Sequence, residues 1–179
     1  MHKKLNASDA VLLSFDLEFN RALKTANLGR NQIGAEGTAA LSEALKSNNT
    51  LETLGLARNN IRAAGAQSLA DMLQVNRSLN SLDLCGNDLG EASSTVAQAV
   101  LQHPTMEVFC NIPMKKMRED SLTELNLSNK GIGAHGAMVI APLLEFSRAL
   151  KSANLGGNEI GDGGAIAISA ALELSLIHI

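Results

Sequence analysis

Three glycines in the C-terminal half of the chain have the spacing of a dinucleotide-binding turn. Gly131, Gly133 and Gly136 spell G-x-G-x-x-G between a strand-like segment at 122–127 and an apolar, helix-like segment at 137–146. In that setting, glycines allow a tight turn and a close approach of the backbone to a pyrophosphate group. The rest of the chain decides whether this turn serves a cofactor.

The segment that contains these glycines is one copy of a repeat. Similar segments begin at Leu23, Leu51, Leu79 and Leu150. The starts at Leu23, Leu51 and Leu79 are 28 residues apart, and so are those at Leu122 and Leu150. Self-similarity at a fixed period of this length indicates stacked strand–helix units.

Comparison of the copies removes the cofactor interpretation. Gly131 stands where the other copies have polar side chains, and Asn154 stands where a ribose-binding site would need an acidic residue. The other two glycines belong to the repeat, since they recur as Gly34, Gly90 and Gly161, and as Gly37, Gly65 and Gly164. No Ser/His/Asp set or pair of carboxylates can be nominated either. We therefore expect no cofactor and no enzyme activity.

Each copy predicts one short strand, one turn and one helix. Leu51, Leu54 and Leu56 include the period-two pair of a strand with one buried face. An asparagine follows, whose amide can satisfy backbone groups because it both donates and accepts hydrogen bonds. The predicted structural turn asparagines are Asn31, Asn59, Asn87 and Asn158. The copy from Leu122 has Lys130 at this place, so the asparagine ladder should break there.

The complete pattern resembles a known family. The motif L-x-x-L-x-L-x-x-N-x-I, followed by small residues and a leucine-containing helix, is seen most fully from Leu51 to Leu73. It resembles the ribonuclease-inhibitor-type subfamily of leucine-rich repeats, with similar repeats in Ran GTPase-activating proteins and in the sensor arm of NOD-like receptors. The resemblance implies an α/β leucine-rich-repeat solenoid, or horseshoe, with a parallel concave sheet and convex helices. We expect all the strands to lie in a single curved sheet.

Residues 1–179 are predicted to form a single leucine-rich-repeat domain. Repeats start near residues 23, 51, 79, 106, 122 and 150, and the copy at 106–121 is truncated because its last part is too short for the usual helix. The first residues resemble the helix of a preceding repeat and residues 173–179 form an atypical tail, so we expect a fragment of a longer array. Residues 1–22 and 173–179 should be the least ordered or worst packed, because each lacks a neighbouring repeat.

Composition excludes several classes of ligand. A formal net charge of −3, no Trp or Tyr and only four Phe favour neither nucleic acid nor an anionic membrane as a partner. Two cysteines do not make a disulfide framework, and Cys85 and Cys110 are interpreted as free thiols in preference to a redox pair. No signal peptide is recognised, so a cytoplasmic location is expected. No metal site is predicted from the four histidines, which lie far apart at His2, His103, His135 and His178.

Function is therefore expected on the outward side chains of the strands, which line the concave face. We predict a non-catalytic scaffold that binds a protein partner of unknown identity across this face. A GTPase-activating or NOD-like-receptor-type regulatory arm is the alternative. The residues predicted to bind the partner are small, polar or charged: Arg30, Thr53, Arg58, Asp83, Glu124, Asn126 and Asn154.

Overall fold

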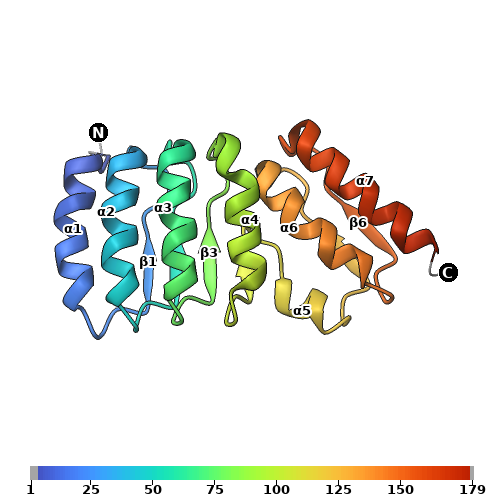
Figure 1. The fold of residues 1–179 in the computed structure, drawn as a ribbon, viewed down its shortest axis with the longest axis horizontal. Helices are drawn as coiled ribbons and strands as arrows, with labels where there is room; N and C mark the ends of the chain where they lie inside the picture. The colour runs from blue at the N-terminus through green and yellow to red at the C-terminus, as the bar shows by residue number, and fades with distance from the viewer. Residues whose placement is uncertain (1–3, 178–179) are drawn as a thin grey trace.

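A computed structural model describes residues 4–177 of the chain, with side chains as far as residue 174. Helices and short strands alternate along it (Figure 1). The strands are β1 (Thr25–Asn27), β2 (Thr53–Gly55), β3 (Ser81–Asp83), β4 (Val108–Phe109), β5 (Glu124–Asn126) and β6 (Ser152–Asn154). The helices are α1 (Ala7–Phe19), α2 (Gly34–Ser47), α3 (Arg62–Val75), α4 (Ser93–Gln102), α5 (Met114–Arg118), α6 (Gly133–Glu145) and α7 (Gly161–Ile177), with the 3-10 turn η1 (Gly90–Ala92) before α4.

The elements form two layers. The helices lie side by side in one layer, with the strands behind them (Figure 1). All the pairings between the named strands are parallel. This arrangement confirms the predicted architecture, in which a parallel sheet on one side is covered by helices on the other.

Strand register follows the period of the sequence. Ala26 pairs with Leu54, which pairs with Leu82, so each inward side chain lies beside its equivalent in the next repeat. Leu54 is fully buried, and so are Ile61 and Leu69, which approach from the turn and from α3. Complete burial of one such side chain stabilises the fold by about 1.5–3 kcal/mol before entropy is counted. The core is therefore a continuous apolar layer between the sheet and the helices.

The single curved sheet that the sequence predicted is wrong, because the strands form two sheets. β1 to β4 make a four-stranded sheet, whereas β5 and β6 pair only with each other. After β4 the chain turns back on itself: the Phe109 amide donates to the Ile112 carbonyl at 3.1 Å, and the Ile112 amide donates to the Phe109 carbonyl at 2.7 Å. Cys110 and Asn111 make this reversal with left-handed φ values of 47° and 65°. The backbone groups of Phe109 are thus bonded within the truncated repeat and do not pair with β5.

We call the boundary between β4 and β5 the seam. It is crossed by packing of α4 against α6. It is also crossed by one backbone hydrogen bond, from the Gly86 amide to the Gly131 carbonyl at 2.8 Å. Gly131 has a φ of 67°, and a Cβ there would lie 3.4 Å from the Gly86 nitrogen. The left-handed conformation accounts for the first glycine of the G-x-G-x-x-G pattern, and Asn60 adopts the same conformation at the equivalent place, with a φ of 56°.

Asn59 shows how a turn asparagine joins neighbouring repeats. The residue is fully buried. Its Nδ2 donates to the carbonyls of Leu28 at 2.7 Å and Leu56 at 3.1 Å, and its Oδ1 accepts from the Ile33 amide at 3.4 Å. Its own backbone amide donates to Asn87 Oδ1 at 2.8 Å. One side chain therefore satisfies groups in its own turn and in the preceding turn.

The ladder is interrupted at the seam and resumes beyond it. The backbone amide of Asn87 donates a hydrogen bond to the Leu84 carbonyl of its own repeat at 3.3 Å. In the next full repeat, Lys130 has no acceptor, and its backbone amide donates to Asn158 Oδ1 at 3.0 Å. Asn158 also accepts from the Gly131 amide at 2.8 Å and donates to the Leu127 carbonyl at 2.8 Å.

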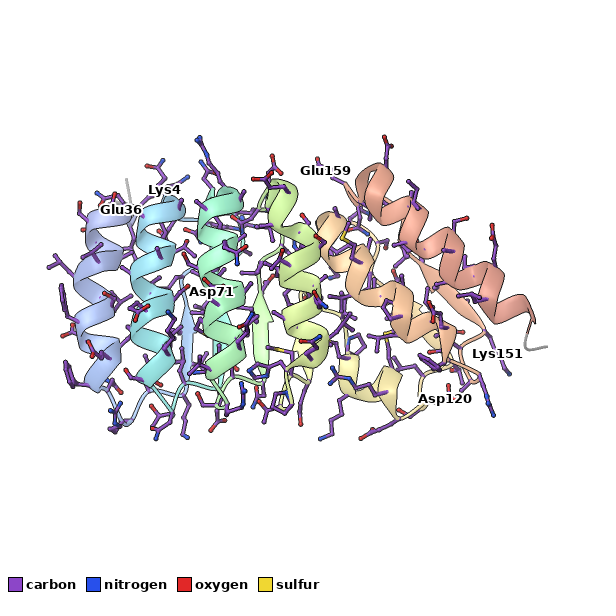
Figure 2. The ribbon with its side chains drawn as sticks, in the orientation of Figure 1. Lys4, Glu36, Asp71, Asp120, Lys151 and Glu159 are labelled. Atoms are coloured by element: carbon purple, nitrogen blue, oxygen red, sulfur yellow. The ribbon has the colours of Figure 1, made fainter. Side chains whose placement is uncertain are left out.

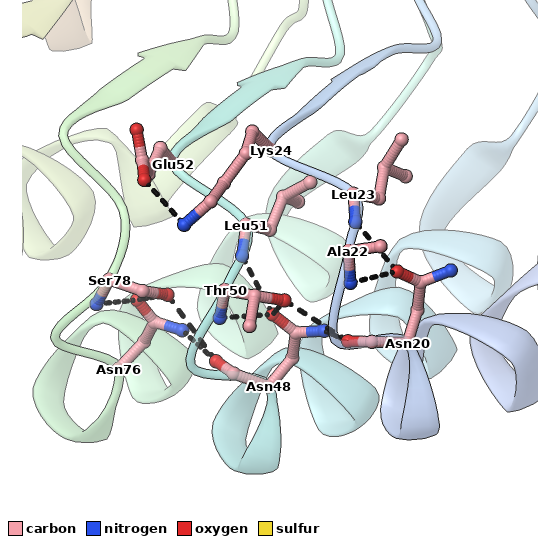
Figure 3. A network of polar contacts seen from close by, with 10 residues as sticks. All are labelled: Asn20, Ala22, Leu23, Lys24, Asn48, Thr50, Leu51, Glu52, Asn76 and Ser78. Carbon is pink, nitrogen blue, oxygen red and sulfur yellow. Dashed lines mark hydrogen bonds and ion pairs between the residues drawn. The ribbon is translucent and has the colours of Figure 1, made fainter.

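A second ladder, which the sequence analysis missed, lies where each helix returns to a strand (Figure 3). The Nδ2 of Asn48 donates to the carbonyls of Leu17 at 2.6 Å and Asn20 at 3.0 Å, while its Oδ1 accepts the amides of Thr50 and Leu51. Asn76 repeats these bonds one repeat later, and His103 Nε2 continues the ladder to the Asn76 carbonyl at 2.9 Å. The signal was present in the sequence, because Asn20, Asn48 and Asn76 are 28 residues apart.

The second half replaces this ladder with a carboxylate. Asp120 Oδ1 accepts the backbone amides of Arg148 and Ala149 at 2.8 and 2.9 Å. Figure 2 shows Asp120 and Lys151 at the same edge of the molecule, where the loops run from the helices to the strands. An acceptor is thus kept at the equivalent turn although the asparagine is absent.

The described part of the N-terminal segment, from residue 4, forms a capped helix with one buried face. Asn6 and Asp9 form a capping box at the start of α1, and Ala10 and Leu17 on its inner face are buried. Only the outer face lacks a neighbour, since Phe19 there is 72% exposed. At the other end, Glu173 and Leu174 are exposed, and the rest of the predicted tail, 175–179, lies outside the described side chains.

Replacing Asn59 by Ala should destabilise the fold by about 1–3 kcal/mol, because buried carbonyl and amide groups of two turns would lose their partners. Urea denaturation followed by circular dichroism measures the change. Asn49→Ala is the matched control, since Asn49 is exposed and its replacement should stay within about 0.5 kcal/mol. Equal midpoints for the two variants would contradict the structural role of Asn59.

Candidate functional site

The seven predicted binding residues differ in exposure. Arg30 and Arg58 are exposed on the turns after β1 and β2, where both have left-handed φ values of 61° and 55°. Thr53 and Asp83 are half-buried, whereas the three residues on the second sheet are exposed: Glu124, Asn126 and Asn154. The candidate surface therefore extends over both sheets and is most open in the second.

Three of these side chains are already hydrogen-bonded to their own backbone. Asp83 Oδ1 accepts the Cys85 amide at 2.9 Å, Asn126 Oδ1 accepts the Ser128 amide at 3.1 Å, and Asn154 Oδ1 accepts the Gly156 amide at 3.0 Å. Asn27 does the same for Gly29 at 3.1 Å. Such turns stabilise the exit from a strand. These residues can offer a partner only their remaining donor or acceptor sites.

The arginines and a neighbouring ion pair supply the charge on the first sheet. The stem of Arg58 lies over the next turn, because a Cβ on Gly86 would lie 2.8 Å from Arg58 Cγ. Lys24 and Glu52 form an ion pair across adjacent strands with N–O distance 2.7 Å (Figure 3). An exposed pair of this kind contributes little to stability, so both side chains remain free to exchange partners.

A cleft of about 620 Å³ lies at the edge where the loops enter β2 to β4, beside α5. Its wall carries both signs of charge. The lining residues are Glu52, Arg77, Ser78, Asn80, Pro104, Thr105, Met106, Glu107, Lys115, Arg118 and Glu119.

Two cations of the cleft are held by backbone carbonyls. Arg77 donates to the carbonyl of Gln74 at 2.7 Å and to its neighbour Asn76 at 2.8 Å, at the end of α3. Arg118 donates to the carbonyls of Met106 at 2.8 Å and Leu101 at 3.2 Å. Cations at a helix C-terminus are favoured by the helix dipole. The cleft is therefore shaped by fixed side chains.

The seam brings together three groups that the sequence analysis did not combine. The ligand atoms of Asp83, Cys85 and Cys110 lie within 4.8 Å of one another. Both cysteines are buried free thiols. The sequence analysis interpreted the two cysteines as free thiols in preference to a redox pair and assigned Asp83 to partner binding. Asp83 stands two residues before Cys85, at the end of the same strand, and that spacing was the available signal.

His135 lies near this cluster at the start of α6. Its ring meets the Phe109 ring edge-on, with centroids 5.9 Å apart and planes at 74°. The side chain is buried, and its Nε2 has no hydrogen-bond partner among the described residues. His135 is therefore held mainly by packing.

The ionisation of these groups does not suit a cysteine nucleophile. Burial, a hydrogen bond with Cys85, and the charges of Cys85 and Asp83 raise the pKa of the Cys110 thiol. Burial lowers the pKa of His135 to about 4, and the charge of Asp83 opposes this shift only in part. A thiolate–imidazolium pair requires the opposite shifts. At neutral pH both groups are uncharged, so the cluster lacks an activated nucleophile.

Comparison with known families agrees with this geometry. A family model described as a leucine-rich repeat matches residues 19–42, 47–70 and 147–169. Its matches include the segments that form β1, β2 and β6. The fold is a leucine-rich-repeat solenoid. Within it, the narrower ribonuclease-inhibitor-type resemblance stays a prediction.

Two solved structures resemble this solenoid. One is titled "Leiomodin-1 Actin-Binding Site 2" and is 19% identical in sequence. The match covers 95% of this chain and 90% of that chain, with a TM-score of 0.55. The other, a tropomodulin C-terminal domain from Caenorhabditis elegans, is 17% identical, covers 96% of this chain and 94% of its own, and has a TM-score of 0.52. At these identities the likeness shows the fold alone. A comparison with curated protein sequences gave no match.

Among the described residues, none of the helices has the length and apolar character needed to cross a bilayer.

His135 should make the folded state sensitive to acid. Its pKa is about 4 in the folded state and about 6.5 in an unfolded chain. The unfolded state therefore binds more protons between these values, and stability should fall by about 3 kcal/mol as pH falls through this window. Urea denaturation of the protein and of His135→Leu at several pH values measures the difference.

His135→Leu should lose less stability than the unchanged protein between pH 6.5 and pH 4. His103→Asn is the comparison variant, because His103 is another buried histidine whose pKa burial lowers, while the hydrogen bond that its ring donates to the Asn76 carbonyl opposes the shift. Parallel pH profiles for the unchanged protein and His135→Leu would show that His135 does not contribute.

Proposed function

We propose that this chain is a non-catalytic scaffold that binds a protein partner on its concave sheet face. The observation that carries the proposal is the charged cleft of about 620 Å³ at the edge of that face. Its shape is fixed by Arg77 and Arg118, whose guanidinium groups are bonded to backbone carbonyls. A preformed surface loses little side-chain entropy when it binds, which favours affinity.

Arg30 and Arg58 are the proposed anchors of the interface. They are exposed and occupy the same place in neighbouring turns. Arginine is enriched among the residues that carry binding energy, and its planar group binds carboxylates with two parallel hydrogen bonds. A partner that presents acidic side chains would fit this pair. Glu124 on the second sheet would then contact a different part of the same partner.

Actin is the first partner to test. The solved structure titled as a leiomodin actin-binding site shares this fold over nearly the whole chain. The likeness makes actin a candidate and does not identify the partner. No feature of the described residues favours the GTPase-activating or receptor-arm alternative over the scaffold.

The proposal includes a cytoplasmic location and a ribonuclease-inhibitor-like subfamily. Two buried free thiols are compatible with a reducing compartment. The subfamily rests on the repeat pattern, most complete from Leu51 to Leu73. Neither nucleic acid nor a membrane surface is proposed as a partner, given the formal net charge of −3.

Charge reversal at both anchors should weaken partner binding. For Arg30→Glu/Arg58→Glu we expect a loss of about 2 kcal/mol or more, which is roughly 30-fold in affinity. Binding of purified actin is measured first by fluorescence anisotropy. Quantitative affinity capture, comparing the unchanged protein with the variant, covers partners other than actin.

A matched control changes the same charge on the helix layer. Lys46 and Arg62 are on α2 and α3, and Lys46→Glu/Arg62→Glu should leave partner binding within about twofold. The scaffold proposal fails if no protein depends on Arg30 and Arg58. It also fails if the control weakens binding as much as the concave-face variant does.

A further inference from the structure

A set of soft and acidic ligand atoms lies in one place on the four-stranded side of the seam. Asp83 ends β3, Cys85 follows two residues later, and Cys110 follows β4 directly. Their ligand atoms lie within 4.8 Å of one another. Cys110 is fully buried, Cys85 is 6% exposed, and Asp83 is half-buried. The two cysteines therefore form the core side of the cluster, and solvent reaches the cluster from the side of Asp83.

The backbone reversal of the truncated repeat places Cys110 in this cluster. In the intact repeats, the amide of the strand leucine donates to a backbone carbonyl of the next strand, as Leu56 does to Asp83 at 2.8 Å. At the seam, the equivalent Leu84 amide donates to Cys110 Sγ at 3.3 Å. The left-handed conformation of Cys110, with a φ of 47°, places its side chain where a carbonyl would otherwise lie.

The other two ligand atoms are also held by hydrogen bonds. Asn111 Nδ2 donates to Cys85 Sγ at 3.5 Å. Asp83 Oδ1 accepts the Cys85 amide at 2.9 Å. N–H donors directed at sulfur and carboxylate ligands are the usual outer contacts of a metal centre, where they orient the ligands. Each of the three groups thus has such a contact before any ion binds.

We propose that Asp83, Cys85 and Cys110 form a zinc-binding site. Zinc binds thiolates at about 2.3 Å and carboxylates at about 2.0–2.2 Å, so the ligands of a tetrahedral ion lie about 3.5–3.8 Å apart. That separation fits within the 4.8 Å of the cluster. Two sulfurs select zinc over calcium and magnesium, which prefer oxygen ligands. Three protein ligands leave the fourth position of a tetrahedral ion for water or for a side chain of a partner.

A divalent cation at this place binds the deprotonated sulfurs. Binding releases one proton from each thiol to solvent, so two thiolates and one carboxylate give the site a net charge of −1 with zinc bound.

A cobalt titration tests the site directly. Co²⁺ is added to the purified chain in a buffer with a thiol-free reductant, and absorption is followed in the near ultraviolet and visible. We expect thiolate-to-cobalt charge-transfer bands and tetrahedral bands that saturate at one equivalent. Zn²⁺ should abolish these bands by displacement and should raise the melting temperature, because it binds only the folded state.

Three variants separate the ligands from their supports. Cys85→Ser should remove much of the charge-transfer intensity, and Asp83→Asn should weaken zinc binding at least about tenfold. Asn111→Gly keeps the left-handed turn but removes the donor to Cys85, and should weaken binding about tenfold. Asp71→Asn, on the helix layer (Figure 2), is the control and should leave zinc affinity unchanged.

The assay needs no protein partner, so its outcome is independent of the proposed scaffold function. Circular dichroism of each variant shows whether it folds, and Asp83→Asn and Asn111→Gly decide the question if a cysteine variant does not. Absence of charge-transfer bands would overturn the zinc site. So would zinc affinity that is unchanged in Cys85→Ser, or a disulfide between Cys85 and Cys110 in the chain purified under reducing conditions.

Discussion

The structure depends on side-chain groups that satisfy the backbone wherever the chain changes direction. With strands of only two or three residues, the turns contain much of the backbone that must find hydrogen bonds. Asn59 serves this need after a strand, and Asn48 serves it after a helix. Each also bonds to the preceding repeat, so the same amide that closes a turn fixes the stacking of its neighbour. The apolar core can then continue without interruption between the layers.

This use of polar groups limits the functional surface. Asp83, Asn126 and Asn154 face outward, but each has an oxygen bonded to its own backbone. A partner therefore meets a face whose polar groups are largely preorganised, with Arg30 and Arg58 as the long side chains able to reach it. The cleft beside α5 exists because the truncated repeat carries a short helix where the intact repeats carry a long one.

The periodic part of the fold could be predicted because the same pattern of leucine and asparagine residues recurs in successive repeats. Leucine spacing gave the inward side chains such as Leu54, and the recurring asparagine gave Asn59 its place in the turn. The two separate sheets could not be predicted in this way, because they result from a backbone reversal at Cys110 and Asn111 that no other copy contains. The Asp83, Cys85 and Cys110 cluster depends on that reversal, which joins residues from two repeats. Periodicity describes what repeats share, and this cluster lies where they differ.

The seam has a consequence for how the chain unfolds. A solenoid behaves as a line of units, each coupled to its neighbours, and its cooperativity extends only as far as that coupling is strong. Across the seam, strand pairing is lost, and the coupling includes the packing of α4 on α6, the Phe109–His135 ring contact and the Gly86–Gly131 bond. The residues on its two sides therefore form two cooperative blocks, which can exchange their amide hydrogens at different rates. A ligand that bridges the boundary would merge the blocks into one unit.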